Sequence, residues 1–341
     1  MTLIENIYGQ TMLLVPELAT SLTILLAVLL DKVLGEAKKY HYLIGFGYLA
    51  DKVESKLNPN NPQSSLGASN LKSTLKTKLL GTFSWCLLVL PLPIMYFFIF
   101  DSLVWYWQVL LDATVLYLAI GLNSLHHHAM QIYKPLKSGD LDRARHFTGY
   151  IVSRETNLLS EQEMSRATIE SMLENGHDSV IASLVYYIIG GAPLVILHRF
   201  ANTLDAMWGY KNPRFNHFGY ASAKLDDLLG FVSGKCCTLL YAIQGGFQKS
   251  LVNAYQQGNQ YKSHNGGWVM AAGATVMKIT LGGNAIYHGK TVTSPTLGLK
   301  LSLSSSITNE DIPRSLALVS RATISLFLLV FIYQLARYIL V

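Results

Sequence analysis

The chain has 341 residues, of which half are hydrophobic and 14% carry a charge, and its formal net charge is +6. A mean hydropathy of +0.29 with so few charges is typical of an integral membrane protein with sizeable polar loops, and it argues against a soluble globular domain. The basic residues are spread among acidic ones without a basic run, so we expect no nucleic-acid partner. The cysteines form no CxxC pair, which favours a reducing compartment.

Four apolar segments predict membrane spans, because each approaches the roughly 20 residues that a helix needs to cross a bilayer. They are residues 13–30, 79–100, 103–122 and 316–341. Only Asp101 and Ser102 separate the second span from the third, so these two are expected to form a tight hairpin. Pro91 and Pro93 are expected to kink the second span.

A fifth apolar run, Val180 to Leu197, is interrupted by Gly190-Gly191-Ala192-Pro193. A full crossing would put the polar clusters on either side of it on opposite faces of the membrane. A re-entrant pair of half-helices, or two helices in the interface, keeps the clusters together, and we favour that arrangement.

Lysines indicate the orientation of the chain. Residues 31–78 contain eight lysines, whereas residues 1–12 and the turn at 101–102 contain none, so segments 31–78, 123–178 and 198–315 are expected to face the cytoplasm. The predicted fold is one all-α integral membrane domain over residues 1–341, surrounded by the lipid of the inner (plasma) membrane. It has about four transmembrane helices, a broken re-entrant or interfacial helix pair, and helical cytoplasmic loops.

An acidic helix face precedes the broken run. Arg166, Glu170, Glu174 and Asp178 recur every four residues, so a helix places them on one face. One interpretation is a solvated face with an Arg166–Glu170 ion pair. The other is a site for Mg²⁺ or a substrate amine, since hard cations prefer carboxylate oxygens.

A second polar cluster follows the broken run, and it comprises Asn202, Asp205, Lys211, Lys224, Asp226 and Asp227. Adjacent carboxylates repel one another unless a cation or a basic side chain lies between them. The cluster is therefore either a helix surface paired to Lys224 or a metal site. The turn at residues 209–213 either places Lys211 against a phosphate or is only a loop.

Three other polar features have weaker interpretations. Consecutive helical residues point in different directions, so His126, His127 and His128 cannot all bind one ion, and one functional histidine is favoured. Asp112 lies within a predicted span and is a functional candidate that a polar partner could satisfy. The Gly-rich segments 264–274 and 281–290 match neither common phosphate-binding loop.

Several motifs occur together in a characteristic order. They are "GDLDRARHFTGYIVSRET" (139–156), "IESMLENGHDSVIASLVYYIIGGAPL" (169–194), "RFANTLDAMWGYKNPRFNHFGYASAKLDDL" (199–228), "HNGGWVMAAGA" (264–274) and "LGGNAIYHG" (281–289). From about residue 22 to 340 the chain resembles the membrane adenosylcobinamide-phosphate synthases of cobalamin biosynthesis. The resemblance implies an ATP-dependent amide ligase that uses Mg²⁺ and joins adenosylcobyric acid to aminopropanol phosphate or a close analogue. Its partners would be the corrinoid and amino-alcohol phosphate substrates, other enzymes of the cobalamin pathway, and further copies of the chain in an oligomer.

The resemblance also implies roles for individual residues. Catalytic acid–base work is expected of Glu174, Asp178 and Asp205, and metal binding of Glu170, Glu174, Asp178, Asp205, Asp226 and Asp227. Substrate or phosphate contacts are expected of Arg154, Asn175, Asn202, Lys211, Lys224 and Asn265. If these residues form one cytoplasmic-face site, Asp205, Asp226 and Asp227 lie near Glu174 and Asp178 in space.

The chain departs from the family pattern where prolines are expected, as in Ser233-Gly234-Lys235 in place of Pro-Ala-Arg. These departures leave the exact amino-alcohol open. The alternative function is a non-catalytic inner-membrane regulatory homologue of the type linked to β-lactamase induction. A transporter is less favoured, because only about four spans are available and the loops are long.

Overall fold

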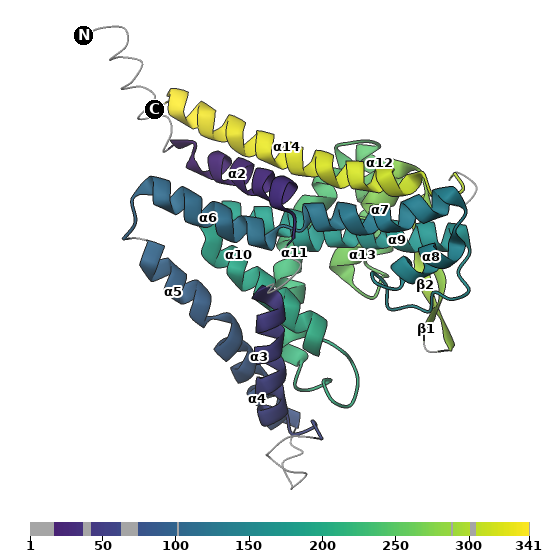
Figure 1. Cartoon of the computed structure of the whole chain (residues 1–341), viewed down its shortest axis with the longest axis horizontal. Coiled ribbons are helices and arrows are strands. Elements are labelled where there is room, and N and C mark those ends of the chain that lie inside the picture. The colour runs from purple at the N-terminus through teal and green to yellow at the C-terminus, as the bar shows by residue number, and fades with distance from the viewer. Residues whose placement is uncertain are drawn as a thin grey trace.

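The computed structural model describes residues 17–36, 42–62, 74–100, 102–287, 289–300 and 305–340, and these residues are mostly helical (Figure 1). The helices are α2 (Ala19–Leu34), α3 (Tyr42–Leu57), α4 (Thr74–Val89), α5 (Pro91–Phe100), α6 (Trp105–Ala119), α7 (Leu122–Ser138), α8 (Leu141–Thr148), α9 (Glu161–Asn175), η1 (Gly176–Ile181), α10 (Ala182–Trp208), α11 (Tyr220–Ala242), α12 (Phe247–Gly258), α13 (His264–Met277) and α14 (Asp311–Leu340). The predicted all-α class is confirmed. Parts of three predicted segments lie outside the described residues: 13–16 of the first span, 37–41 and 63–73 of the segment 31–78, and 288 and 301–304 of the segment 198–315. Asp101 of the predicted hairpin turn and Val341 at the end of the last span lie outside them as well.

A small β-ribbon is the departure from the all-α expectation. Strands β1 (Thr280–Tyr287) and β2 (Lys290–Gly298) pair antiparallel, and the pairing is irregular between Leu281 and Gly283. The backbone adopts φ of +80° at Gly282 and +88° at Gly283, a conformation that glycine reaches without strain. Glycines without regular alternation of apolar residues hid this strand in the sequence.

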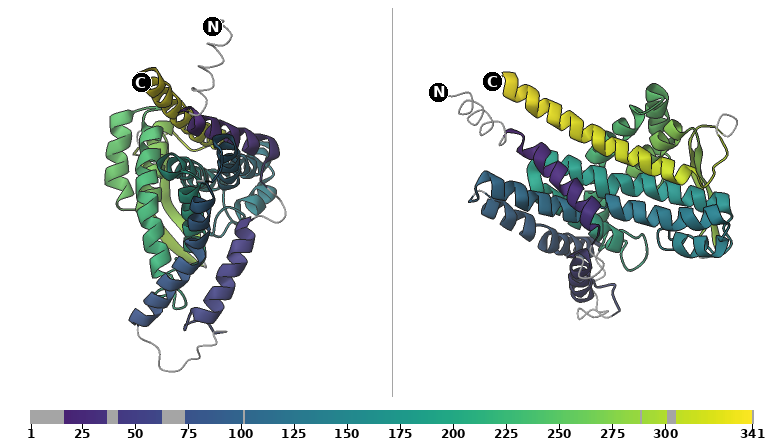
Figure 2. Two further views of the ribbon diagram at one scale, coloured as in Figure 1. Left: turned by 90° about the vertical axis from the view of Figure 1, so that its left-hand side faces the viewer. Right: turned by 45° about the horizontal axis from the view of Figure 1, so that its top comes forward.

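Four helical stretches within the described residues are long and apolar enough to cross a membrane. They are Thr74–Phe100, Trp105–Ser138, Glu161–Trp208 and Asp311–Leu340. Three of them overlap the predicted spans 79–100, 103–122 and 316–341, and the remaining one contains the broken run. Helix α2, with 16 residues, overlaps the first predicted span from Ala19 to residue 30, and it packs along α6 and α14 (Figure 2).

The second span is interrupted at Pro91, as expected. Helix α4 ends at Val89 and α5 begins at Pro91, because proline has no N–H to continue the helical hydrogen bonds. Pro93 lies in the first turn of α5 and causes no second break. Helices α3 and α4 project downward in Figure 1, where they pack against the second half of α10 and against α11.

The broken apolar run is a helical hairpin, as predicted. Gly190 has non-helical angles (φ −157°, ψ 29°), and Gly191 adopts φ +66°, so α10 consists of two half-helices joined at this point. The rings of Tyr186 and His198 stack with centroids 5.0 Å apart. Twelve residues of straight helix would separate them by about 18 Å, so the chain must reverse. We call residues 182–208 the re-entrant hairpin after the predicted arrangement; its position relative to the membrane, re-entrant or interfacial, stays a prediction.

The tip of the re-entrant hairpin lies beside a buried acid. Asp112 on α6 accepts hydrogen bonds from the hydroxyls of Tyr96, at 2.5 Å, and Tyr187, at 3.0 Å. A Cβ added to Gly191 would lie 4.0 Å from Asp112 Oδ2. Asp112 therefore has the polar partners that its intramembrane position requires, and they tie the hairpin to α5 and α6.

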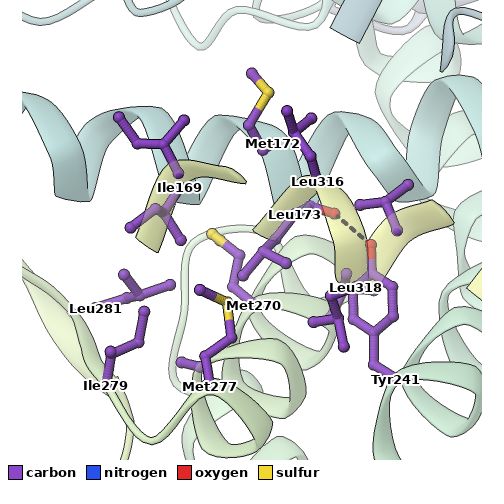
Figure 3. Packing of buried hydrophobic residues seen from close by; sticks show 14 of the residues in the cluster. Ile169, Met172, Leu173, Tyr241, Met270, Met277, Ile279, Leu281, Leu316 and Leu318 are labelled. Carbon is purple, nitrogen blue, oxygen red and sulfur yellow. Dashed lines mark hydrogen bonds between the residues drawn. The ribbon is translucent and has the colours of Figure 1, made fainter. Parts of the chain in front are cut away.

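The main core surrounds α9 and η1 (Figure 3). Ile169 and Leu173 of α9 are fully buried against side chains of α11, α13, β1 and α14, and the Tyr241 hydroxyl donates to the Leu173 carbonyl at 3.3 Å. Burying a side chain of this size stabilises the fold by about 1.5 to 3 kcal/mol. A Cβ at Gly176 would lie 2.6 Å from Val319 Cγ2, so close packing requires glycine there. The core thus fixes the segment that carries Glu174 and Asp178.

Candidate functional site

Three aspartates from three segments converge at the base of the re-entrant hairpin. Asp178 comes from η1, Asp205 from the second half of the hairpin, and Asp226 from α11. Burial, followed by the negative charges of Asp178 and Asp205, raises the pKa of Asp226 to about 8. We call Asp178, Asp205 and Asp226 the acidic cluster. Their mutual repulsion means that a bound cation would stabilise the ionised cluster.

Asp178 is held by neighbours that sequence reasoning did not assign to the site. The Nδ1 atom of buried His177 lies 2.7 Å from Asp178 Oδ1, and its Nε2 lies 2.9 Å from Ser233 Oγ on α11. Arg199, on the returning half of the hairpin, donates from Nη1 to the Asp178 carbonyl at 3.5 Å. Because Arg199 follows Asp178 by 21 residues, only the hairpin geometry reveals this contact. His177 and Arg199 both lie within the sequence motifs, which was the available signal.

Asn202 and Asp227 lie at the margin of the acidic cluster. Asn202 donates from Nδ2 to Asp226 Oδ1 at 3.4 Å. Asp227 lies 3.8 Å from Lys224 Nζ, and both side chains are more than half exposed, so this pair contributes little to stability. Lys224 thus pairs with Asp227, whereas half-buried Asp226 interacts electrostatically with the other two aspartates.

Glu174 of α9 lies against the start of α13, the helix that carries Asn265. A Cβ added to Gly266 would lie 2.7 Å from Glu174 Oε1, so the helix approaches this carboxylate closely. Glu174 interacts electrostatically with both Asp178 and Lys262. Asn265 donates from Nδ2 to the Asp227 backbone carbonyl at 2.9 Å. The structure therefore brings four of the predicted acids into one neighbourhood: Glu174, Asp178, Asp205 and Asp226.

Glu170 faces another part of the molecule. It forms a buried ion pair with Arg154 at 2.6 Å, and its other oxygen accepts from the Gly282 backbone N–H at 2.8 Å. The Arg166–Glu170 ion pair is therefore wrong, and Arg166 instead donates to the Asn284 carbonyl at 3.3 Å. Arg154 reaches Glu170 from the α8–α9 loop, and this pair joins the loop to the β-ribbon. The predicted metal-binding role of Glu170 and phosphate-binding role of Arg154 remain untested.

Lys211 is exposed in the loop 209–219, which is anchored to α3. Arg214 donates from Nε and Nη2 to the two oxygens of Glu54, at 2.9 and 2.6 Å. Glu54 is only 1% exposed and also accepts from Asn58 Nδ2 at 2.6 Å. A bidentate arginine–carboxylate pair holds its partners in a defined geometry. Sequence reasoning missed Glu54, because its partner lies 160 residues away.

The acidic cluster matches the chemistry of a hard cation. It offers carboxylate oxygens, the ligands that Mg²⁺ prefers, and a divalent ion would offset the repulsion between its three carboxylates. No group of three or more His, Cys, Asp or Glu side chains in the described ranges is already gathered tightly enough to hold an ion. The predicted metal ligands therefore remain a hypothesis, in which substrate phosphates and water would complete the coordination.

Comparisons with known proteins identify the family. The family described as "CobD/Cbib protein" matches residues 24–319. Among curated relatives, "Cobalamin biosynthesis protein CobD" of Stutzerimonas stutzeri is 42% identical over 279 residues, covering 81% of this chain and 87% of the relative. The protein of the same name from Chromobacterium violaceum is 40% identical over 303 residues, covering 87% and 91% of the two chains. Comparison with solved structures found no match. The chain belongs to the CobD/Cbib family of cobalamin biosynthesis proteins.

Proposed function

We propose that the protein is an ATP-dependent amide ligase that joins aminopropanol phosphate, or a close analogue, to adenosylcobyric acid. The observation that carries this proposal is the convergence of Asp178, Asp205 and Asp226 at the base of the re-entrant hairpin. Half-buried, mutually repelling carboxylates suit a magnesium-nucleotide complex, and a scaffold protein has no need of them. The curated relatives, named for cobalamin biosynthesis, support a corrinoid as the acid substrate. The site would face the cytoplasm from the inner membrane.

The proposed reaction has two steps. A carboxylate oxygen of the corrinoid attacks the γ-phosphorus of ATP, and the bond to the β–γ bridging oxygen breaks, which releases ADP and leaves an acyl phosphate. The amine nitrogen then attacks the acyl carbon, inorganic phosphate leaves, and the amine gives up a proton. Bound Mg²⁺ would offset the charge of the transferring phosphoryl group.

The residues of the site divide between these needs. The acidic cluster of Asp178, Asp205 and Asp226 would hold the cation, with Asp227 and Glu170 as more distant candidates. Glu174 and Asp178 would accept the amine proton, since a general base must lie within hydrogen-bond reach of the proton it removes. Arg154, Asn175, Asn202, Lys211, Lys224 and Asn265 would contact phosphates or the amides of the corrinoid.

The test uses full-length protein purified in detergent, with ATP, MgCl₂, adenosylcobyric acid and aminopropanol phosphate. We expect the amide product by mass spectrometry together with one ADP for each product. Asp178→Asn should lower kcat by at least about 100-fold, a loss typical for a group that handles protons in the transition state. His126→Gln is a matched control, because His126 is exposed on α7 outside the acidic cluster. If a preparation that melts cooperatively forms no ATP-dependent product, the regulatory alternative is favoured.

A further inference from the structure

A separate cavity of about 320 Å³ lies beside the acidic cluster. It is open on one side, and its lining comes from the chain just after α2, from α7, the α8–α9 loop, α9, η1 and the re-entrant hairpin. The polar side chains that line it include Ser171 and Asn175 from α9, Ser179 from η1, Ser124 and His128 from α7, and Arg199 from the hairpin. Glu36 lines it as well and is exposed, which places an acid at the rim. We call this space the Arg199 cavity.

Arg199 is the cationic group that lines the Arg199 cavity. Its Nε is buried and, among the described residues, has no hydrogen-bond partner. Its Nη1 donates to the backbone carbonyl of Asp178 at 3.5 Å, a long and weak contact, and the guanidinium also shares a side-chain hydrogen bond with Tyr42. A guanidinium carries five N–H donors in a planar fork that matches a phosphate, so Arg199 retains donor capacity for an anion in this cavity.

The histidine tract adds a second donor to the same space. His126 and His127 are exposed, whereas His128 is half-buried and lines the Arg199 cavity. The geometry of a helix predicted that only one of the three would face a given site. The side chains of Ser171 and Ser179 supply further hydroxyl donors on the α9–η1 wall. The cavity therefore offers one permanent cation, one imidazole and several hydroxyls.

Size and charge restrict what this space can hold. About 320 Å³ lies near the lower end of the range of about 300 to 1,000 Å³ for small-molecule pockets. A corrin macrocycle is far too large for it. A nucleoside triphosphate carries about four negative charges, which Arg199 alone would not balance. A phosphate monoester with an amine fits both restrictions, because the phosphate meets Arg199 and the ammonium meets Glu36.

We propose that the Arg199 cavity binds the phosphorylated amine, with its phosphate on Arg199 and His128 and its amine toward the rim at Glu36. This assignment rests on the proposed ligase function for the identity of the substrate. It separates the amine phosphate from the acidic cluster, which remains for the magnesium-nucleotide complex. Arg199 joins the two, since it contacts the backbone of Asp178 while it lines the cavity.

The test compares Arg199→Gln and His128→Gln with His126→Gln as the control from the same helix. In the ligase assay, the KM for aminopropanol phosphate should rise at least tenfold in Arg199→Gln and several-fold in His128→Gln. The KM values for ATP and the corrinoid should change less than twofold, and His126→Gln should match the wild type. If Arg199→Gln fails to fold, the KM of His128→Gln tests the proposal instead. His128 is half-buried on the surface of a helix, so its replacement should leave the fold intact.

Calorimetric binding without ATP or corrinoid keeps the two proposals distinguishable. The wild type should bind aminopropanol phosphate more tightly than it binds aminopropanol, inorganic phosphate, ATP or nanodiscs of phosphatidylethanolamine. Affinity for aminopropanol phosphate should fall most in Arg199→Gln, less in His128→Gln and not in His126→Gln. Binding with that ranking but without product formation would support the cavity and refute the ligase. Product formation with an equal KM for the amine in all variants would refute the cavity, as would variants that raise only the KM for ATP.

Discussion

Replacing Asp226 by asparagine removes a half-buried charge without changing the size of the side chain, and it should make the protein more stable. The pKa of Asp226 is raised from 3.8 to about 8, first by burial and then by the charges of Asp178 and Asp205. The folded protein thus holds this proton more tightly than the unfolded chain does. Stability falls as the pH rises from about 4 to about 8, and above that the penalty is complete.

The size of the effect follows from the shift. About four pH units correspond to a ceiling of about 6 kcal/mol. Relaxation and water penetration reduce such penalties, so we expect about 3 kcal/mol at pH 8.5. With an unfolding entropy of about 2.1 cal/mol/K per residue, 341 residues convert this into a rise in Tm of about 4 °C.

The assay follows thermal unfolding in detergent by the fluorescence of the five tryptophans between pH 5 and 9, with and without MgCl₂. The Tm advantage of Asp226→Asn should grow from pH 5 to 8, and MgCl₂ should stabilise the wild type more than the variant. Asp227→Asn is the control, since its exposed side chain should change stability by less than about 0.5 kcal/mol. A variant that is less stable than the wild type at pH 8.5, or a Tm difference that ignores pH, would refute the reasoning.

Three further substitutions test the packing around the site. Glu54→Ala should lower the free energy of unfolding by about 2 to 3 kcal/mol, which is less than for a fully buried pair because Arg214 is half-exposed. In limited digestion, trypsin should cut the loop 209–219 sooner in Glu54→Ala than in the control variant Lys52→Gln. Gly81→Ala places a Cβ 1.9 Å from the Phe218 carbonyl oxygen and should cost about 3 kcal/mol by thermal melting, whereas Gly45→Ala, with open space around it, should be neutral or stabilising by up to about 1 kcal/mol; equal Tm values would contradict this. Gly176→Ala should cost about 2 kcal/mol through its contact with Val319, and Val319→Ala should recover part of that loss in a double-mutant cycle; strictly additive changes would show that the two positions do not meet.

The re-entrant hairpin was predictable because its cause is local. Gly190 and Gly191 allow backbone angles that end a helix, and Pro193 begins the next one. The break at Pro91 was predictable for the same kind of reason. Both depend on residues whose backbone behaviour hardly changes with their surroundings.

The contacts of the site were less predictable, because they join distant segments. A spacing of four residues correctly placed Arg166 and Glu170 on one helix, but it could not reveal that Arg154 lies closer to Glu170. The proximity of Asp226 to Asp178 was expected from the order of the family motifs and not from spacing, since three packed helices create it. The β-ribbon was missed because glycines at positive φ, and not alternating apolar residues, shape β1.

The tip of the re-entrant hairpin is the point about which its returning half-helix can tilt. From Gly191 to Asp205 the returning half-helix is about 21 Å long, so a tilt of about 3° at the tip moves Asp205 by about 1 Å relative to Asp178. A displacement of that size can cost a catalytic site most of its rate. The hydrogen bonds of Tyr96 and Tyr187 to Asp112 restrain this tilt at the tip, among the apolar helices. The distance between Asp205 and Asp178 at the base of the hairpin thus depends on the hydrogen bonds of Asp112 at its tip, which lie away from the base by about two-thirds of the thickness of a bilayer core.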